Sequence, residues 1–224
     1  MLNIESLSLS YQDTQVIRDL DLSVKRGEAL AIVGPSGAGK STLLTYLYQQ
    51  LKQDAALCSQ SQGLVDALSV FHNVYMGALA RHWFGYNLLN LVWPMATPCQ
   101  EVQQLCRDLY LEVPIETAVS SLSGGQRQRV ALARALYQQQ AVFIGDESFS
   151  ALDPMMAQRL LNLVKARHET VIMVLHDSDL ALQNFDRIIG LSEGKLVLDQ
   201  PTSQLDSQQL ARFFDTQMAS TPHG

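Results

Sequence analysis

The sequence predicts an α/β fold with a mostly parallel core sheet, an antiparallel pair of strands at the N-terminus and a separate helical subdomain. Three observations lead to this prediction. Short, unbroken apolar runs alternate with segments of helical periodicity, which is typical of strands buried on both faces of a parallel sheet. At the N-terminus, apolar residues alternate with polar ones, as in half-buried antiparallel strands. Between residues 66 and 121 the strand pattern gives way to helical spacing.

The N-terminal elements are expected to be two paired strands followed by a fully buried one. Apolar residues come close to a period of two within residues 2–9 and again within 20–24, and the polar stretch 12–15 separates the two segments. Residues 29–33 are an unbroken apolar run that ends at Gly34. Because this run is short and apolar on both faces, it indicates a strand inside a parallel sheet.

The later elements repeat this alternation of buried strand and helix. Helical segments are expected at about 155–167 and after Asp177. Further strands are expected at three apolar runs, residues 141–144, 171–175 and 188–191. We therefore expect one domain over residues 1–214 with a helical subdomain at about 66–121, and a loose tail over 215–224, which has little to bury.

Composition excludes several functional classes. The chain has 16 basic and 22 acidic residues, and its net charge of −6 disfavours nucleic acid as the main partner. No apolar run approaches the roughly 20 residues that span a bilayer, and the first residues do not form an export signal. Cys58, Cys99 and Cys106 lack metal-ligand spacing and are expected to be reduced. These features together predict a cytoplasmic protein.

The strongest motif is a phosphate-binding loop at residues 34–41. Its sequence, Gly-Pro-Ser-Gly-Ala-Gly-Lys-Ser, fits the pattern GxxxxGK[ST] and directly follows a predicted buried strand. Glycines allow backbone N–H groups to surround a phosphate, Lys40 reaches the β- and γ-phosphates, and Ser41 places its hydroxyl on Mg²⁺. The motif predicts a P-loop NTPase, whose ATP-binding residues would be Gly34, Pro35, Ser36, Gly37, Ala38, Gly39, Lys40, Ser41 and Thr42.

A pair of acidic residues follows the predicted strand at 141–144. Asp146 is expected to hold Mg²⁺ through water, and Glu147 to orient and deprotonate the attacking water as a general base. An isolated Asp-Glu pair is a weak signal, but the phosphate loop upstream makes this interpretation the favoured one.

Residues 122–126, Leu-Ser-Gly-Gly-Gln, resemble the signature of ATP-binding cassette (ABC) ATPases. A serine and a glycine at a helix start offer a hydroxyl and an N–H to a second anion. The resemblance implies a head-to-tail pair in which the signature of one cassette reaches the nucleotide of the other. The partner would be a second copy or a paralogous cassette, and the signature residues are Ser123, Gly124, Gly125 and Gln126.

Other positions match this family in the expected order. Tyr11 resembles the aromatic residue that stacks on adenine. Gln60 resembles the glutamine that touches Mg²⁺ and the attacking water, with Gln62 as the less favoured assignment. Asp153 lies in the segment that resembles the dimer-interface loop, and His176 resembles the γ-phosphate switch histidine. By resemblance, the catalytic residues are therefore Glu147, His176 and Gln60, and the metal residues Ser41, Gln60 and Asp146.

Two features depart from the family pattern. Only twenty positions separate Lys40 from Gln60, where the family normally inserts an additional strand-rich stretch, so the antiparallel β-subdomain is expected to be reduced. Ser148 stands where a proline usually follows the catalytic glutamate, and a proline ring would restrict that backbone.

The resemblance implies an ATP- and Mg²⁺-dependent subunit on the inner face of the membrane, attached through permease subunits and served indirectly by a solute-binding protein. Segments 64–74 and 179–191 resemble phosphonate-import ATPases, which favours import over export. The alternatives are a cassette ATPase without transport and a nucleotide-binding regulator with weak hydrolysis. Four apolar residues of the helical subdomain are either core or a contact for a membrane subunit, namely Trp83, Phe84, Trp93 and Met95.

Overall fold

The computed structural model describes residues 1–11, 14–59, 63–149, 152–206 and 210. They divide into two compact units, which are described one at a time. The first contains Met1–Ala55, Ile144–Glu147 and the described residues from Glu169 onward, and the second contains Ala56–Phe143 and Ser148–His168. No helix in the described ranges is both long and apolar enough to cross a bilayer.

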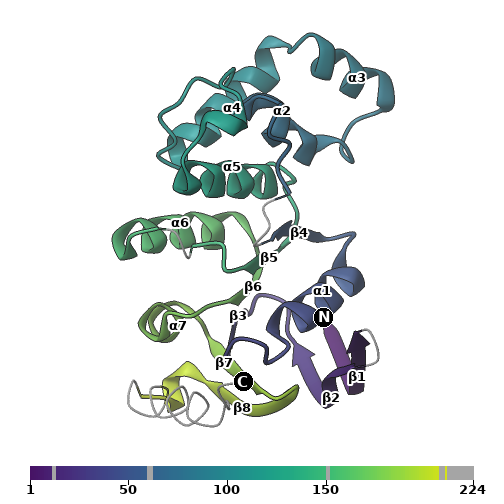
Figure 1. Cartoon of the computed structure of the whole chain (residues 1–224), viewed down its shortest axis with the longest axis vertical. Helices are drawn as coiled ribbons and strands as arrows, with labels where there is room; N and C mark the ends of the chain where they lie inside the picture. The colour runs from purple at the N-terminus through teal and green to yellow at the C-terminus, as the bar shows by residue number, and fades with distance from the viewer. Residues whose placement is uncertain (12–13, 60–62, 150–151, 207–209, 211–224) are drawn as a thin grey trace. The chain divides into compact units, whose positions relative to one another are not determined.

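The larger sheet has six strands in the order β4-β5-β6-β3-β7-β8 (Figure 1). The central strand β3 pairs in parallel with β6 and β7, and β8 closes one edge antiparallel to β7. Every residue of β3, β5 and β6 is buried, as expected for unbroken apolar runs. The strands are β3 (Ala29–Val33), β4 (Ala55–Cys58), β5 (Val142–Asp146), β6 (Thr170–Val174), β7 (Arg187–Ser192) and β8 (Lys195–Pro201).

The N-terminal strands form a separate antiparallel sheet of two strands, β1 (Leu2–Tyr11) and β2 (Thr14–Val24). The register pairs Leu2 with Val24 and Tyr11 with Thr14. Apolar side chains on alternate positions of β2 are buried, which explains the period of two in the sequence. The predicted fold class, with its mostly parallel core sheet and small antiparallel sheet, is confirmed.

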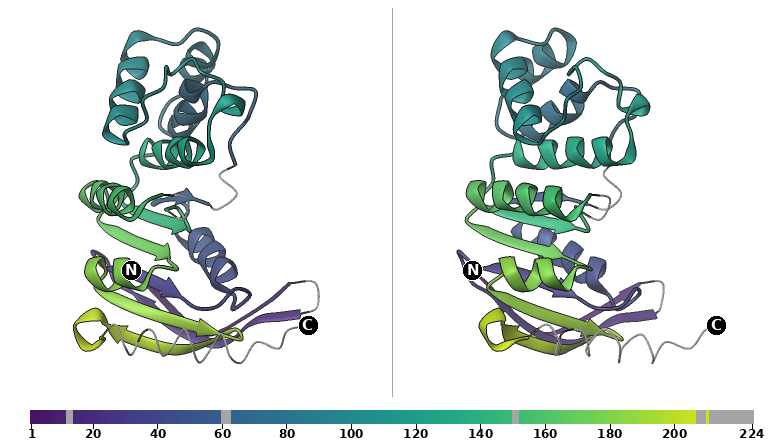
Figure 2. Two further views of the ribbon diagram at one scale, coloured as in Figure 1. Left: turned by 60° about the vertical axis from the view of Figure 1, so that its left-hand side comes forward. Right: turned by 90° about the vertical axis from the view of Figure 1, so that its left-hand side faces the viewer.

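The helices are distributed over both units. In the first unit α1 contacts β2 and β6, and in the second unit α2 packs against α4 and α5 (Figure 2). The helices are α1 (Lys40–Leu51), α2 (Val70–Tyr75), α3 (Phe84–Val92), α4 (Ala96–Asp108), α5 (Gly124–Leu136), α6 (Pro154–Arg167) and α7 (Ser178–Asn184). Short 3₁₀ turns lie at Met76–Ala78, Val119–Ser121 and Thr202–Gln204.

Two strands of the larger sheet were not predicted from the sequence. The strand β4 has only four residues, which is too short for a periodic pattern to stand out. The strand β8 lies at an edge and is largely exposed, so it lacks the apolar run that marked the central strands. Neither strand therefore leaves a clear signal in the sequence.

A polar network fixes the beginning of β3, the strand that leads into the phosphate loop. The guanidinium of Arg187 donates to both carboxylate oxygens of Asp199 at 2.5 and 2.6 Å, to Ser23 O at 2.9 Å and to Glu28 at 3.3 Å. Asp186 accepts from the first backbone N–H of β3, at Ala29, over 2.8 Å. Charge-assisted bonds of this kind help to hold the strand ends in register.

A candidate nucleotide-binding and hydrolysis site

The phosphate loop connects β3 to α1 and depends on glycine at two positions. Gly34 has a φ of 149°, and a Cβ there would lie 2.3 Å from Leu191 O. Gly39 has a φ of 98°, and its Cβ would lie 2.7 Å from the Cδ1 atom of Ile17. Both positions combine a left-handed backbone with a close neighbour, so only glycine fits without strain. The loop is therefore folded tightly against β2 and β7.

The start of α1 is suited to an anion. Gly39 occupies the N-cap position without a side-chain cap, and the first turn has no acidic residue. The first N–H groups of a helix lack intrahelical partners and carry the positive end of the helix dipole. A phosphate at this position would satisfy these groups and meet a favourable field.

Lys40 provides a cation inside the loop. Its side chain is only 6% exposed, and its Nζ atom donates to Gly34 O at 2.8 Å and to Pro35 O at 2.9 Å. Burial lowers the pKa of Lys40, while the carboxylates of Glu147 and Asp146 act in the opposite direction. The ammonium group thus lies in the first unit, near enough to both acids to interact with them electrostatically.

Asp146, the last residue of β5, is buried beside Ser41. Its carboxyl group is hydrogen-bonded with the Ser41 side chain, and its Oδ1 atom is buried without a hydrogen-bond partner among the described residues. Burial raises the pKa of Asp146, and the Ser41 bond lowers it. A carboxylate oxygen without a partner next to a hydroxyl is a donor set that fits Mg²⁺, which prefers hard oxygen ligands. These two residues therefore fit the predicted metal site.

Glu147 and His176 meet although 29 positions separate them. The Nε2 atom of His176 lies 2.5 Å from Oε1 of Glu147. Glu147 follows the end of β5 with a φ of +50°, which is the left-handed region that non-glycine residues seldom adopt. His176 lies two residues beyond the end of β6. The structure thus brings the acid and the histidine together in the unit that also holds Lys40, Ser41 and Asp146.

The remaining predicted residues are placed as follows. Tyr11 ends β1 and is 68% exposed, so its ring is accessible. Thr42 lies in the first turn of α1. Asp153 belongs to the second unit, where its side chain caps α6 by accepting from Met156 N at 3.0 Å. Gln60 and its alternative Gln62 lie outside the described residues.

The signature segment forms the N-terminus of α5 in the second unit. Ser123 Oγ accepts from Gln126 N at 3.3 Å, and Gln126 Oε1 accepts from Ser123 N at 2.9 Å, which is a capping box. Ser123 and Gly124 are exposed, and a Cβ on Gly124 would meet no atom within 4 Å. The motif therefore presents a rigid, accessible helix start.

The helix α3 of the second unit turns apolar side chains outward. Trp83 and Trp93, which flank it, are 75% and 76% exposed, and Phe84 and Val92 at its ends are similarly exposed. Leu88, Leu89 and Met95 add to this surface, which we call the α3 face. Of the two interpretations left open by the sequence, core or contact surface, the structure supports an accessible surface.

Two asparagines anchor α3 from the inner side. Asn87 Nδ2 donates to Leu79 O and His82 O at 2.9 and 3.0 Å, and its Oδ1 accepts from the Tyr75 hydroxyl at 3.1 Å. Asn90 is fully buried and accepts from Met95 N at 3.1 Å. The helix thus buries amides and exposes hydrocarbon, the reverse of an ordinary surface helix. Helical periodicity in the sequence does not show which side of α3 faces the interior, so the exposed apolar face could not be predicted.

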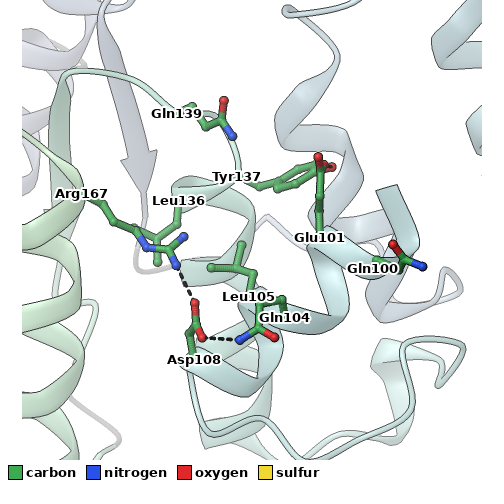
Figure 3. A pocket seen from close by; sticks show the side chains of 9 residues that line it. All are labelled: Gln100, Glu101, Gln104, Leu105, Asp108, Leu136, Tyr137, Gln139 and Arg167. Carbon is green, nitrogen blue, oxygen red and sulfur yellow. Dashed lines mark hydrogen bonds and ion pairs between the residues drawn. The ribbon is translucent and has the colours of Figure 1, made fainter. Parts of the chain in front are cut away.

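A separate cavity of about 420 Å³ lies within the second unit (Figure 3). Several of its polar groups pair with one another: Arg167 with Asp108 at 2.6 Å, Gln104 with Asp108 at 2.8 Å, and Tyr137 with Glu101 at 2.6 Å. Because these groups already satisfy each other, they provide structural bonds between α4 and the segments around it. None of these residues was a candidate from the sequence.

Comparison with known proteins agrees with this geometry. A family model described as ABC transporter matches residues 17–150. The protein named phosphonates import ATP-binding protein PhnC 1 of Natronomonas pharaonis is 37% identical over 96% of this chain and 100% of its own length. The protein of the same name from Pseudomonas syringae pv. tomato is 34% identical over 98% of this chain and 93% of its own.

Solved structures show the same fold. The dimeric post-hydrolysis structure of the ATP-binding cassette MJ0796 bound to ADP and Pi has a TM-score of 0.77 at 22% identity, covering 90% of this chain and 99% of that one. The ADP conformation of the cassette MJ1267 has a TM-score of 0.75 at 18% identity, covering 99% of this chain and 100% of that one.

Proposed function

The chain belongs to the ABC transporter family, and from this premise we propose that it is the ATP-binding and ATP-hydrolysing subunit of an importer for phosphonates or related small solutes. The observation that carries the hydrolytic part is the grouping of Lys40, Ser41, Asp146, Glu147 and His176 in one unit. In such a system the membrane and solute-binding partners select the solute, so this chain's own residues do not identify it. The type of solute is therefore proposed from the names of the relatives.

The proposed roles rest on the resemblance to the family, and the positions of the described residues support them. The phosphate loop and Lys40 bind the β- and γ-phosphates, and Tyr11 contacts the adenine. Ser41 and Asp146, with Gln60 by resemblance, would hold Mg²⁺, which would neutralise charge on the phosphates. Glu147 accepts the proton of the attacking water, and His176, which bonds Glu147 at 2.5 Å, orients that carboxylate and the γ-phosphate.

The exposed signature segment supports a two-cassette arrangement. Ser123, Gly124, Gly125 and Gln126 form an accessible helix start that can bind the γ-phosphate of a second copy or of a paralogous cassette. Asp153 belongs to the interface loop of the same arrangement. Residues 1–214 are proposed to act as one cassette, with residues 66–121 as its helical subdomain and 215–224 as a tail.

A concentration series tests this proposal directly. The purified chain is expected to release phosphate from ATP with a turnover per chain that rises steeply with protein concentration and disappears when EDTA removes Mg²⁺. Ser123→Arg is expected to abolish turnover while ATP binding by the phosphate loop persists. A turnover per chain that stays constant on dilution would contradict the shared site, and ATP binding without turnover would favour the regulator.

The α3 face supports a contact with the membrane permease. No Asp, Glu, Lys or Arg occurs between residues 82 and 100. A charged group of a partner would lose its water at this surface and find no opposite charge to pair with, which is costly. An uncharged, apolar segment of a permease subunit is therefore the partner that fits. This contact would hold the cassette peripherally on the inner face of the cell membrane.

We expect the double variant Trp83→Lys, Trp93→Lys to lose co-purification with the permease in detergent while its ATPase activity without permease stays unchanged. Lysine introduces two charges into a contact that excludes water, which is costly. Val197→Lys is the matched control, because Val197 is a half-exposed apolar residue on β8, in the other unit. Undiminished permease binding by the double variant would exclude the α3 face as the contact.

A further inference from the structure

Ser148, directly after Glu147, is buried and makes a long-range hydrogen bond. Its side chain is 3% exposed, and its hydroxyl donates to the backbone oxygen of Cys58 at 3.2 Å. Cys58 is the last residue of β4, so the bond joins two segments that are 90 positions apart in the sequence. Both residues belong to the second unit.

Ser148 and its partner Cys58 are both buried, at 3% and 2% exposure. The Cys58 thiol is also buried, and burial raises the pKa of this thiol to about 11, so it stays protonated at neutral pH. The Cys58 backbone oxygen therefore provides a buried acceptor for the serine hydroxyl. A buried hydroxyl that loses its acceptor retains a desolvation cost, which favours keeping this bond.

The preceding residue requires such support. Glu147 has a φ of +50°, and a non-glycine residue stays in this region only when its surroundings hold it there. A proline at position 148 would restrict the backbone through its ring, whereas serine leaves the backbone free. The hydroxyl bond to Cys58 supplies a restraint that the serine backbone by itself lacks.

We propose that Ser148 is a positioning residue for ATP hydrolysis: its bond to Cys58 O holds the backbone that follows Glu147 and so keeps the Glu147 carboxylate in place. The inference rests on the proposed role of Glu147 as the base. Since Ser148 has no part in the phosphate loop, its loss should affect turnover and leave ATP binding alone.

The test compares Ser148→Ala with Ser148→Thr in the purified chain. The alanine variant is expected to lower kcat about tenfold with the KM for ATP changed less than twofold, because a poorly placed base slows only the chemical step. The threonine variant keeps the hydroxyl and should retain at least half of the wild-type kcat. Thermal unfolding of each variant shows whether it is folded at the assay temperature.

Ser69→Ala is the matched control. Ser69 caps α2, where its Oγ accepts from His72 N, so this variant also loses a serine hydroxyl that bonds the backbone. It should lower the melting temperature without changing kcat. A kcat of Ser148→Ala equal to wild type, or one lowered no more than in the control, would overturn the inference.

The proposed function and this inference fail differently. If the wild-type chain hydrolyses no ATP, the proposed function fails, and the inference with it. If the wild-type chain hydrolyses ATP and Ser148→Ala does so equally well, only the inference fails.

Discussion

Glu147→Gln is expected to bind ATP as the wild type does and to hydrolyse it about 10²- to 10⁴-fold more slowly, the range that a general base contributes. Glutamine keeps the size of the side chain and can still bond His176, but its amide does not accept a proton from water. ATP should therefore hold two chains together in a stalled pair. Phosphate release at saturating ATP measures the rate, and size-exclusion chromatography with ATP detects the pair.

The control for this variant is Glu169→Gln. Glu169 is a half-exposed carboxylate of the same unit that pairs with Arg26 at 2.9 Å. Its substitution should leave the rate unchanged, because the residue lies immediately before β6 and outside the predicted site. Steady-state hydrolysis by Glu147→Gln equal to that of the wild type would exclude Glu147 as the base.

Lys40→Met is expected to lower kcat/KM by about 10²- to 10³-fold, the typical loss when a group that stabilises transition-state charge is removed. Methionine keeps much of the apolar stem of lysine but carries no charge for the β- and γ-phosphates. ATP affinity should fall together with the rate, in contrast to Glu147→Gln. Equilibrium binding of a fluorescent ATP analogue separates these two patterns.

Lysine is the only cation expected to work at position 40. Its Nζ atom lies between Gly34 O and Pro35 O in a nearly closed space, and the larger planar guanidinium of arginine does not match that point-charge geometry. Lys52→Met, just beyond the end of α1, is the matched control and should bind ATP normally. Normal ATP affinity in Lys40→Met would contradict the assignment of this loop as the phosphate site.

Much of the site could be predicted because its parts are contiguous. The phosphate loop from Gly34 to Ser41 needs a fixed order of glycines and a lysine, since the backbone of one short segment forms the anion site. Asp146 and Glu147 were identifiable because they come at the end of a short apolar run in a chain that already carries a phosphate loop. The strands β4 and β8 were not predicted. β4 has only four residues and β8 is largely exposed, so neither leaves a clear apolar pattern.

Other properties depend on residues far apart in the chain. The 2.5 Å contact of His176 with Glu147 requires β5 and β6 to end at one edge of the sheet. The bond from Ser148 to Cys58 joins segments that are 90 positions apart, so no local pattern could predict it. Asn87 and Asn90 are buried, so the opposite, apolar side of α3 faces outward. The sequence alone does not show this choice of side.

The sequence by itself thus determined the fold class, the phosphate loop and the acidic pair, because local backbone geometry and burial on both faces of a strand leave contiguous patterns. Only the tertiary structure decided that His176 bonds Glu147, that Ser148 is held by β4, and that α3 presents hydrocarbon to the surface. The physical reason is that these contacts arise from packing between distant segments, and packing sets side-chain direction and partners that no local pattern encodes.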